Sequence, residues 1–280
     1  MDAYPAQELL RKQDDLLRHL RELGSLVVAL SGGADSAYLA WAAHQALGAR
    51  CLSVTALSPS FSAHDREEVE RVVRQTGVRH VFVETRELDN PLYIANNADR
   101  CYHCKNELFA QLETLAAAHS IVAVAYGINA DDVGDFRPGH RAASEHRVLT
   151  PLLDVRLRKA EIRELSRRAG LPTWDRPASP CLSSRIPYGT PVTPEALSRV
   201  ERAEAVLRRL GYRQFRVRYY GDVACLEIGS DELPRAIETG LAGLVAPDFA
   251  QLGFRAVELD PEGYRQGSLN AALKARSGGS

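Results

Sequence analysis

The sequence predicts an α/β protein in which a parallel β-sheet, covered by helices on both faces, precedes a smaller α+β domain. Two observations lead to this prediction. Short continuous apolar runs, typical of strands buried on both faces, alternate with stretches of helical periodicity. A proline-rich segment then separates this pattern from alternating strands. The length of 280 residues suits one large domain or two modest ones.

The elements of the first domain follow in order. Leucines at helical spacing predict an opening helix over about residues 9–23. Because strands alternate with helices, right-handed crossovers and a parallel sheet are expected. Ser62 and Asp65 have the spacing of a capping box at one helix start. Strands are predicted at 26–30, 51–57, 80–84 and 121–126, and helices at about 37–47, 64–76, 104–118 and 158–169.

The proline-rich loop at 176–194 leads into the second predicted domain. We expect the domains to span 1–185 and 186–275, with a tail at 276–280. Thr193-Pro194 is a helix start, since proline is favoured at the first helical position. The elements expected after it are a helix ended by Gly211, strands at 214–220 and 223–229, a helix near 231–239 and a strand near 252–259.

Composition limits the function classes. The chain has 35 basic and 36 acidic residues, and this balance argues against broad nucleic-acid binding. No apolar run approaches the ~20 residues of a membrane span, and the N-terminus lacks the apolar core of a signal peptide. We therefore expect a cytoplasmic protein without nucleic-acid or membrane partners. Five cysteines, an odd count, argue against a disulfide framework.

The segment Ser-Gly-Gly-Ala-Asp-Ser at 31–36 predicts a phosphate-binding loop. It lies between a buried strand and a helix N-terminus, where backbone N–H groups are unpaired and the helix dipole is positive. Gly32 and Gly33 let the backbone approach an anion, and the hydroxyls of Ser31 and Ser36 add donors. Asp35 fits such a site if it holds a metal ion that bridges to phosphate. The alternative is a tight turn with a helix cap.

A second polar segment begins at Gly127, directly after the strand at 121–126, and we expect Gly127 to take part in binding the ATP cofactor. Strand C-termini face the ligand crevice in such sheets. The adjacent carboxylates of Asp131 and Asp132 could hold Mg²⁺ together with water and phosphate oxygens. Lys159 is a candidate phosphate contact. The alternatives are an Asx-rich turn and a solvated lysine.

The cysteines fall into two groups. Cys101 and Cys104 form a CxxC, which suits a redox dithiol, half a zinc site or part of an iron–sulfur site. Cys181, in the proline-rich loop, is the natural third ligand. Three thiolates suit a [4Fe–4S] cluster whose fourth iron is open to an exogenous ligand. Cys51 and Cys225 lie in apolar strand runs and are expected to be small buried core residues.

In combination, these segments resemble the LarE-type family of ATP-dependent sacrificial sulfur transferases. The phosphate loop matches the SGGxDS signature of the wider superfamily, the N-type ATP pyrophosphatases or PP-loop proteins, whose fold is Rossmann-like. The likeness extends from about residue 8 to 260. It is carried by SGGADS (31–36), the CxxC (101–104), GINADD (127–132), LRKAEIRELS (157–166), ASPCLSSR (178–185) and FRVRYYGDVACLEIG (215–229).

The resemblance implies a reaction. ATP with Mg²⁺ adenylylates a carboxylate of pyridinium-3,5-biscarboxylic acid mononucleotide, and a sulfur nucleophile displaces AMP to give a thiocarboxylate. The product serves the nickel-pincer cofactor of lactate racemase. Cys181 matches the sulfur-donating cysteine, and members with that cysteine alone give up the protein's own sulfur. Members that also have the counterparts of Cys101 and Cys104 are of the cluster type, in which a hydrosulfide is transferred. The likeness also implies a homo-oligomer.

The resemblance also suggests substrate-binding residues. Arg185, Arg216 and Arg218 could clamp the substrate's phosphate and second carboxylate, which arginine binds bidentately. Ser184 could add a hydroxyl, and Glu227 matches a family position associated with metal or substrate. Strand alternation places Arg216 and Arg218 on one face, which could also be an exposed strand face.

Two other functions fit part of the pattern. A tRNA thiolation enzyme can combine the same loop with three cysteines, but it is expected to need an RNA-binding surface. An ATP-binding sensor with a structural metal would explain the loop without catalysis. The near-neutral charge and the small second domain count against the tRNA enzyme. The presence of the loop serines, Asp35, Asp131 and Cys181 counts against a protein without catalysis.

Overall fold

The computed structural model describes residues 6–133, 138–265, 267 and 269, and the tail predicted at 276–280 lies outside them. The chain divides into two compact units. The first comprises Met1–Glu87 and Cys101–Ser179, and the second comprises Leu88–Arg100 and Pro180–Ser280. The second unit therefore includes a short segment taken from within the first. The domain boundary at residue 185 stays a prediction.

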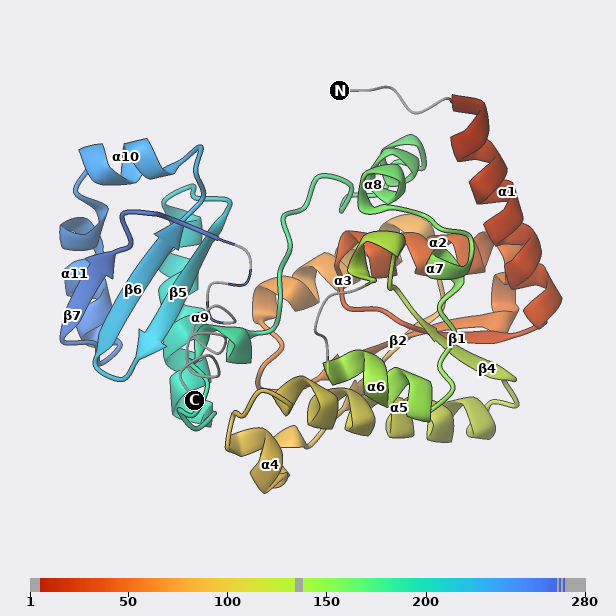
Figure 1. Ribbon diagram of the computed structural model, residues 1–280, viewed down its shortest axis with the longest axis horizontal. Coiled ribbons are helices and arrows are strands. Elements are labelled where there is room, and N and C mark those ends of the chain that lie inside the picture. The colour runs from red at the N-terminus through yellow and green to blue at the C-terminus, as the bar shows by residue number, and fades with distance from the viewer. Residues whose placement is uncertain (1–5, 134–137, 266, 268, 270–280) are drawn as a thin grey trace, which may run out of the picture. The chain divides into compact units, whose positions relative to one another are not determined.

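The first unit contains a four-stranded parallel sheet with the strand order β3-β2-β1-β4 (Figure 1). Leu26 at the start of β1 pairs with Cys51 on one side and Ala123 on the other. The predicted parallel sheet is confirmed. The strands are β1 (Leu26–Ala29), β2 (Cys51–Leu57), β3 (His80–Glu84) and β4 (Ala123–Tyr126).

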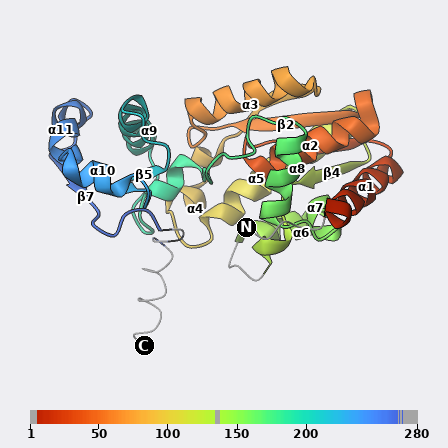
Figure 2. The same ribbon diagram turned by 90° about the horizontal axis from the view of Figure 1, so that it is seen from above.

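Helices cover both faces of this sheet, as the continuous apolar strands require. Alternate strand residues point to opposite faces, so Val28 belongs to one core and Val27 to the other. Helices α2 and α8 lie side by side over the Val28 face (Figures 1 and 2). That face is covered by α1 (Ala6–Leu23), α2 (Ala34–Leu47), α3 (Ala63–Thr76), α7 (Pro151–Asp154) and α8 (Lys159–Arg168). The other is covered by α5 (Arg100–Ala118) and α6 (Pro138–Glu145).

Local chemistry sets several helix ends. Ser62 is the N-cap of α3, and its Oγ accepts a hydrogen bond from the backbone N of Asp65 at 3.0 Å. Helix α5 begins at Arg100, earlier than predicted, so the CxxC lies in its first turn.

Within the described residues, no helix combines the length and apolarity needed to span a bilayer. The short elements are α4 (Pro91–Ile94) and the 3₁₀ turns η1 (Gly48–Arg50), η2 (Glu87–Asp89), η3 (Ala130–Asp132) and η4 (Leu182–Arg185).

The second unit is built on a three-stranded mixed sheet, which confirms the predicted smaller α+β part. Strand β5 (Phe215–Tyr220) is antiparallel to β6 (Val223–Ile228), and β6 is parallel to β7 (Ala256–Leu259). Its helices are α9 (Pro194–Arg209), α10 (Leu233–Glu238) and α11 (Leu241–Gln251). Helix α11 was not predicted from the sequence, because Gly243 and Pro247 within it are helix-breaking residues.

The two faces of this second sheet differ in character. Val217 and Leu226 point into a core shared with α9 and α11. On the other face, Arg216 pairs with Glu227 across the ladder. Cys225 shares that polar face and is half-buried, so the expectation that it is a core residue is wrong. Strand alternation gives the core positions to its neighbours. Cys51 is fully buried, as predicted.

Candidate active site

The predicted phosphate loop connects the C-terminal end of β1 with the N-terminus of α2. Gly32 has φ 77°, in the left-handed region that favours glycine. The Oγ of Ser36 donates to the carbonyl of Gly33 at 3.1 Å and lies 3.1 Å from the Oγ of Ser31. Gly33, the N-cap of α2, offers no side-chain acceptor to the first turn. The first N–H groups of α2 are therefore available to an anion.

Asp35 lies in the first turn of α2, and its two carboxylate oxygens differ in their surroundings. Oδ2 accepts from the Nδ2 of Asn129 at 3.1 Å, whereas Oδ1 is buried without a hydrogen-bond partner in the described part of the chain. Burial raises the pKa of Asp35, against the opposing effect of Lys159, and Asp132 raises it further. An orphaned carboxylate oxygen beside an anion-binding loop fits a Mg²⁺ ligand.

The segment after β4 packs directly against the phosphate loop. A Cβ on Gly127 would lie 2.8 Å from the backbone N of Ser36, so only glycine fits this approach. Asn129 is fully buried and caps η3 by accepting from the N of Asp131 at 2.9 Å. Asn129 was not among the predicted site residues, although it lies within the segment 127–132. Its amide orients both Asp35 and the carboxylate turn.

The two carboxylates of this turn are already engaged. Asp131 Oδ2 accepts from the backbone N of Lys159 at 2.8 Å, which joins η3 to the start of α8. Asp132 Oδ2 accepts from the N of Asn129 at 3.2 Å. Lys159 is also close enough to Asp35 to lower its pKa. The roles of Asp131 and Lys159 toward Mg²⁺ and phosphate stay predictions.

The CxxC occupies the first turn of α5. Cys101 is exposed and Cys104 is half-buried, and residues three apart lie on the same side of a helix. The Sγ of Cys104 lies 3.8 Å from Oε1 of buried Glu87. Two thiols on one helix turn fit two ligand positions of a cluster. Among residues 6–133 and 138–265, however, no three His, Cys, Asp or Glu side chains are arranged to hold a metal ion.

Cys181 belongs to the second unit and directly precedes η4. The residue is half-buried, and its carbonyl accepts three hydrogen bonds. The donors are the N of Ser184 at 2.9 Å, the Oγ of Ser184 at 2.7 Å and the Nη1 of Arg185 at 3.0 Å. The backbone that carries the predicted sulfur-donating cysteine is thus held by η4.

Arg185 is bound by Glu204, a residue of α9 that was not among the predicted site residues. The guanidinium and carboxylate form a bidentate pair, with Nε–Oε1 at 2.8 Å and Nη2–Oε2 at 3.0 Å. Both side chains are only 3% exposed. Glu204 Oε1 also accepts from the N of Val217 at 3.3 Å. Arg185 therefore ties the Cys181 loop to α9 and β5, and its contact with substrate stays a prediction.

Arg216 and Arg218 lie on the polar face of the second sheet and are both 6% exposed, so the alternative of an exposed strand face is wrong. Arg218 donates through Nη2 to Glu227 at 2.8 Å and through Nη1 to the carbonyl of Ser184 at 2.7 Å. Burial and neighbouring Arg185 lower the pKa of Arg216 to about 10, so it stays protonated at neutral pH. The structure gathers Ser184, the three arginines and Glu227 in one place.

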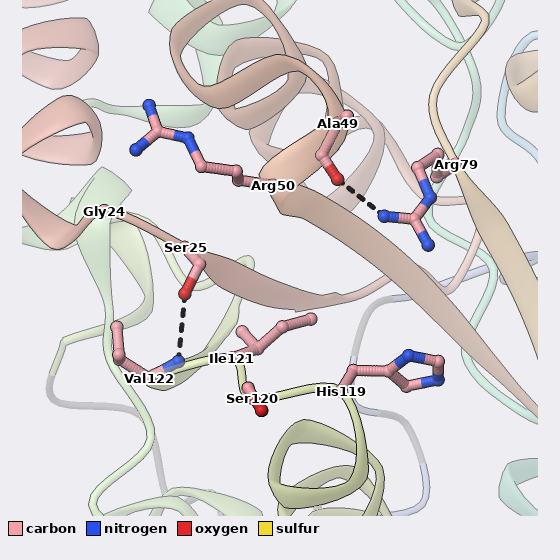
Figure 3. A pocket seen from close by; sticks show the side chains of 9 residues that line it. All are labelled: Gly24, Ser25, Ala49, Arg50, Arg79, His119, Ser120, Ile121 and Val122. Carbon is pink, nitrogen blue, oxygen red and sulfur yellow. Dashed lines mark hydrogen bonds between the residues drawn. The ribbon is translucent and has the colours of Figure 1, made fainter.

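A different pocket, of about 480 Å³, lies at the N-terminal ends of β1, β2 and β4 (Figure 3). The Arg50 side chain points away from Arg79, whose guanidinium turns toward Ala49 (Figure 3). Arg79 Nη1 already donates to the carbonyl of Ala49 at 2.6 Å. Ligands of such sheets bind at the opposite, C-terminal ends of the strands. We therefore do not assign this pocket to the active site.

Comparison with known proteins places the chain in a family. It is 42% identical to an uncharacterized protein of Synechocystis sp. over 94% of this chain and 98% of that protein. It is 32% identical to the pyridinium-3,5-bisthiocarboxylic acid mononucleotide synthase of Lactiplantibacillus plantarum, over 95% of this chain and 96% of the synthase. No family model matches the chain.

A more distant similarity gives the superfamily. The chain is 26% identical to one component of the glutamine-hydrolyzing GMP synthase of Archaeoglobus fulgidus, over 69% of this chain and 68% of that component. This likeness agrees with the phosphate loop, which is the part shared most widely in the superfamily. The near-complete coverage of the synthase, together with the loop geometry, shows that the chain belongs to the LarE-type family of ATP-dependent sulfur transferases within the PP-loop superfamily.

Proposed function

We propose that this protein converts the carboxylates of pyridinium-3,5-biscarboxylic acid mononucleotide to thiocarboxylates, with ATP cleaved to AMP and pyrophosphate. The reaction serves the synthesis of a nickel-pincer nucleotide cofactor. The similarity to the Lactiplantibacillus plantarum synthase, whose name states the product, supports this substrate. The observation that carries the proposal is the phosphate loop with its unpartnered Asp35 oxygen among the described residues.

The first step activates a carboxylate, which is otherwise a poor electrophile. A substrate carboxylate oxygen attacks the α-phosphorus of ATP, the bond to the bridging oxygen breaks, and pyrophosphate leaves. The free N–H groups of α2 and the Ser31 and Ser36 hydroxyls would bind the leaving phosphates. Mg²⁺, when bound by Asp35, would neutralise phosphate charge during this transfer.

The second step replaces AMP by sulfur. Anionic sulfur attacks the carbonyl carbon of the acyl-adenylate, and the C–O bond to AMP breaks. In the single-cysteine form of the reaction, the Cys181 thiolate attacks. Loss of its Cα proton and cleavage of its Cβ–S bond then release the thiocarboxylate and leave dehydroalanine. The carbonyl contacts of Cys181 would hold the residue for the attack.

The presence of Cys101 and Cys104 leads us to favour delivery through an iron–sulfur centre. These two residues and Cys181 would ligate three irons of a [4Fe–4S] cluster, and the position of Cys101 and Cys104 on one side of α5 supports this assignment. When bound, the cluster would supply hydrosulfide sulfur that is anionic at neutral pH. Cys181 would then be retained, and the enzyme could turn over repeatedly.

The arginine cluster supports binding of an anionic nucleotide-like substrate. Arg216 and Arg218 are both buried, where the attraction of a guanidinium to phosphate and carboxylate is weakly screened, and Arg216 stays charged at neutral pH. Glu227 holds Arg218 in position.

We also propose a homo-oligomer, which sedimentation of the purified protein would test.

The proposal is tested on anaerobically prepared protein by measuring iron, acid-labile sulfide and substrate-dependent pyrophosphate release. About four irons per chain, with release of pyrophosphate only when the mononucleotide is present, would support it. Cys181→Ala should stop sulfur transfer and leave adenylylation, and Cys101→Ala should do the same. Cys225→Ala is the matched control, and it should retain iron. Pyrophosphate release that ignores the mononucleotide would contradict the proposed substrate.

If iron does not bind after reconstitution, the reaction in which Cys181 gives up its own sulfur remains as the proposal. The protein mass should then fall by one H₂S after reaction, and Cys101→Ala should transfer sulfur normally.

A further inference from the structure

We infer that Arg176 is a positioning residue that holds the phosphate loop in its ATP-binding conformation. Its guanidinium donates through Nη1 to the carbonyl of Gly32 at 2.6 Å and through Nη2 to Oδ1 of Asp65 at 2.6 Å. The side chains of Arg176 and Asp65 are each 8% exposed. The inference rests on the proposed ATP site, but neither residue belongs to the motifs that predict that site.

The contact with Gly32 acts through peptide geometry. The carbonyl of Gly32 and the N–H of Gly33 belong to one planar trans peptide, so they point in opposite directions. Because glycine flanks this peptide on both sides, the peptide could rotate with little steric resistance. Holding the carbonyl with an arginine selects one orientation. The N–H of Gly33, at the N-cap of α2, is thereby directed away from Arg176.

Arg176 is itself held at its backbone by α8. The carbonyl of Arg176 accepts from Nη2 of Arg163 at 2.5 Å, and Nη1 of Arg163 also donates to the carbonyl of Trp174 at 2.8 Å. The backbone N of Arg176 donates to the carbonyl of Thr173 at 3.2 Å. A side chain anchored at both ends can keep the loop peptide in place when the nucleotide leaves.

The carboxylate of Asp65, the partner of Arg176, accepts hydrogen bonds from several segments of the chain. Asp65 Oδ2 accepts from the Ser62 hydroxyl at 2.6 Å, and Oδ1 accepts from the Ser179 hydroxyl at 3.0 Å. Asp65 therefore joins the first turn of α3 to the chain that leads toward Cys181 two residues later. A buried carboxylate of this kind needs a counter-charge.

Two roles must therefore be separated. Arg176 could act only by neutralising Asp65, which is a structural role, or it could also orient the Gly32 peptide. A lysine would keep the charge but lacks the planar fork that reaches two acceptors. Methionine would remove both the charge and the donors.

The test compares Arg176→Lys with the double variant Arg176→Met/Asp65→Asn, in full-length protein. The double variant removes the buried charge pair together, so folding is retained while the donor to Gly32 is lost. We expect both variants to bind MgATP roughly 10-fold more weakly, the scale of one hydrogen bond to a charged group. The KM for MgATP should rise by a similar factor, with a smaller change in kcat. Calorimetric titration and thermal midpoints measure affinity and folding separately.

The matched control is Arg168→Met, which removes an arginine of α8 whose ion pair with Glu164 is on the surface. This control should bind MgATP like wild type. Wild-type affinity in the folded double variant would overturn the inference and leave a purely structural role. If wild-type protein itself failed to bind MgATP, the proposed ATP site would fall first, and the role of Arg176 with it.

Discussion

At the scale of single residues, the candidate site contains groups that oppose folding. Asp35 is buried with one oxygen unpartnered among the described residues, and burial raises its pKa. An ionised carboxylate in such a place destabilises the folded chain unless a cation joins it. Groups that destabilise the folded chain in this way are concentrated at functional sites.

Asp35→Asn is therefore expected to stabilise the protein while abolishing pyrophosphate release. The folded pKa of Asp35 lies above the unfolded value, so ionisation at neutral pH lowers the free energy of unfolding of wild type. The advantage of the variant should be largest at pH 7 and disappear at acid pH, where the carboxyl is protonated in both states. Thermal midpoints without Mg²⁺ would check this, and a lower midpoint for the variant at pH 7 would contradict it.

His80 predicts that stability also depends on pH, in the opposite direction, because here it is the protonated form of the side chain that burial disfavours. Burial lowers its pKa to about 4, against the weaker effect of Glu70. Thr55 donates its single hydroxyl proton to the carbonyl of Leu30 at 2.6 Å. The Nε2 of His80, 2.9 Å from Thr55 Oγ1, must therefore be the donor in their hydrogen bond. Neutral imidazole thus supports the strand end that precedes the phosphate loop.

Because the unfolded pKa of histidine is about 6.5, the unfolded chain binds more protons than the folded chain between pH 6.5 and about 4. The stability that neutral His80 contributes should be complete above pH 6.5 and decline as the pH falls toward 4. Denaturant midpoints across this range, for wild type and His80→Gln, would measure the difference. Equal slopes in the two proteins would remove His80 as its source.

At the scale of elements, most helices and strands were predictable from periodicity, but their contacts were not. Strands 51–57 and 80–84 were predicted with the bounds that β2 and β3 have. Helix α11 was missed, since its apolar positions Leu241, Val245 and Phe249 overcome an internal proline only by packing into a core. Gly127, predicted to bind the cofactor, is seen to bring β4 against α2.

Gly127→Ala is expected to push β4 and α2 apart. The added Cβ would meet backbone atoms of Ser36 and Asp35 at 2.8 and 2.9 Å, and backbone cannot move aside as a side chain can. Overpacking of this kind costs about 1–3 kcal/mol of unfolding free energy, and MgATP affinity should fall with it. Chemical denaturation and calorimetric titration would show both effects.

Gly243→Ala is the matched control for this substitution. Gly243 lies inside α11, and apart from its chain neighbours and the backbone of its own helix, no heavy atom of the described residues lies within 4 Å of the position that an added Cβ would take. Alanine there should stabilise the helix by roughly 0.5–1 kcal/mol. Equal effects of the two substitutions would show that the contact of Gly127 with α2 is unimportant.

At the scale of the whole molecule, the two units have separate hydrophobic cores. The first unit packs helices on both faces of its sheet, whereas the second packs α9 and α11 on one face. Two units with separate cores allow unfolding of the chain that is not two-state. A ligand bound to one unit should then stabilise that unit selectively.

Phe249→Ala and Phe109→Ala test this independence. Both side chains are fully buried, Phe249 in the second unit and Phe109 in the first, so each truncation should cost about 3–5 kcal/mol. In scanning calorimetry, MgATP should raise the midpoint temperature of the transition that Phe109→Ala lowers. It should not change the midpoint temperature of the transition that Phe249→Ala lowers. A single transition, shifted alike by both variants and by MgATP, would show that the units unfold together.

The sequence alone determined the features that depend on neighbours close along the chain. The parallel α/β architecture follows from the period of apolar residues, and the phosphate loop follows from a hexapeptide whose chemistry is local. The family follows from the order of several such segments. Each of these signals lies within a window of a few residues, so no tertiary contact is needed to detect it.

The pairing of residues that are far apart in the sequence depends on tertiary packing. The segment Leu88–Arg100 belongs to the second unit, where buried Asn96 donates to the carbonyls of Pro187 at 2.9 Å and Thr190 at 2.8 Å. Arg176 reaches Gly32 across 144 positions of sequence. Such pairs depend on how helices and loops pack, because a guanidinium can serve any carbonyl or carboxylate within reach. The sequence shows which polar groups are present, and packing determines which of them form hydrogen bonds with one another.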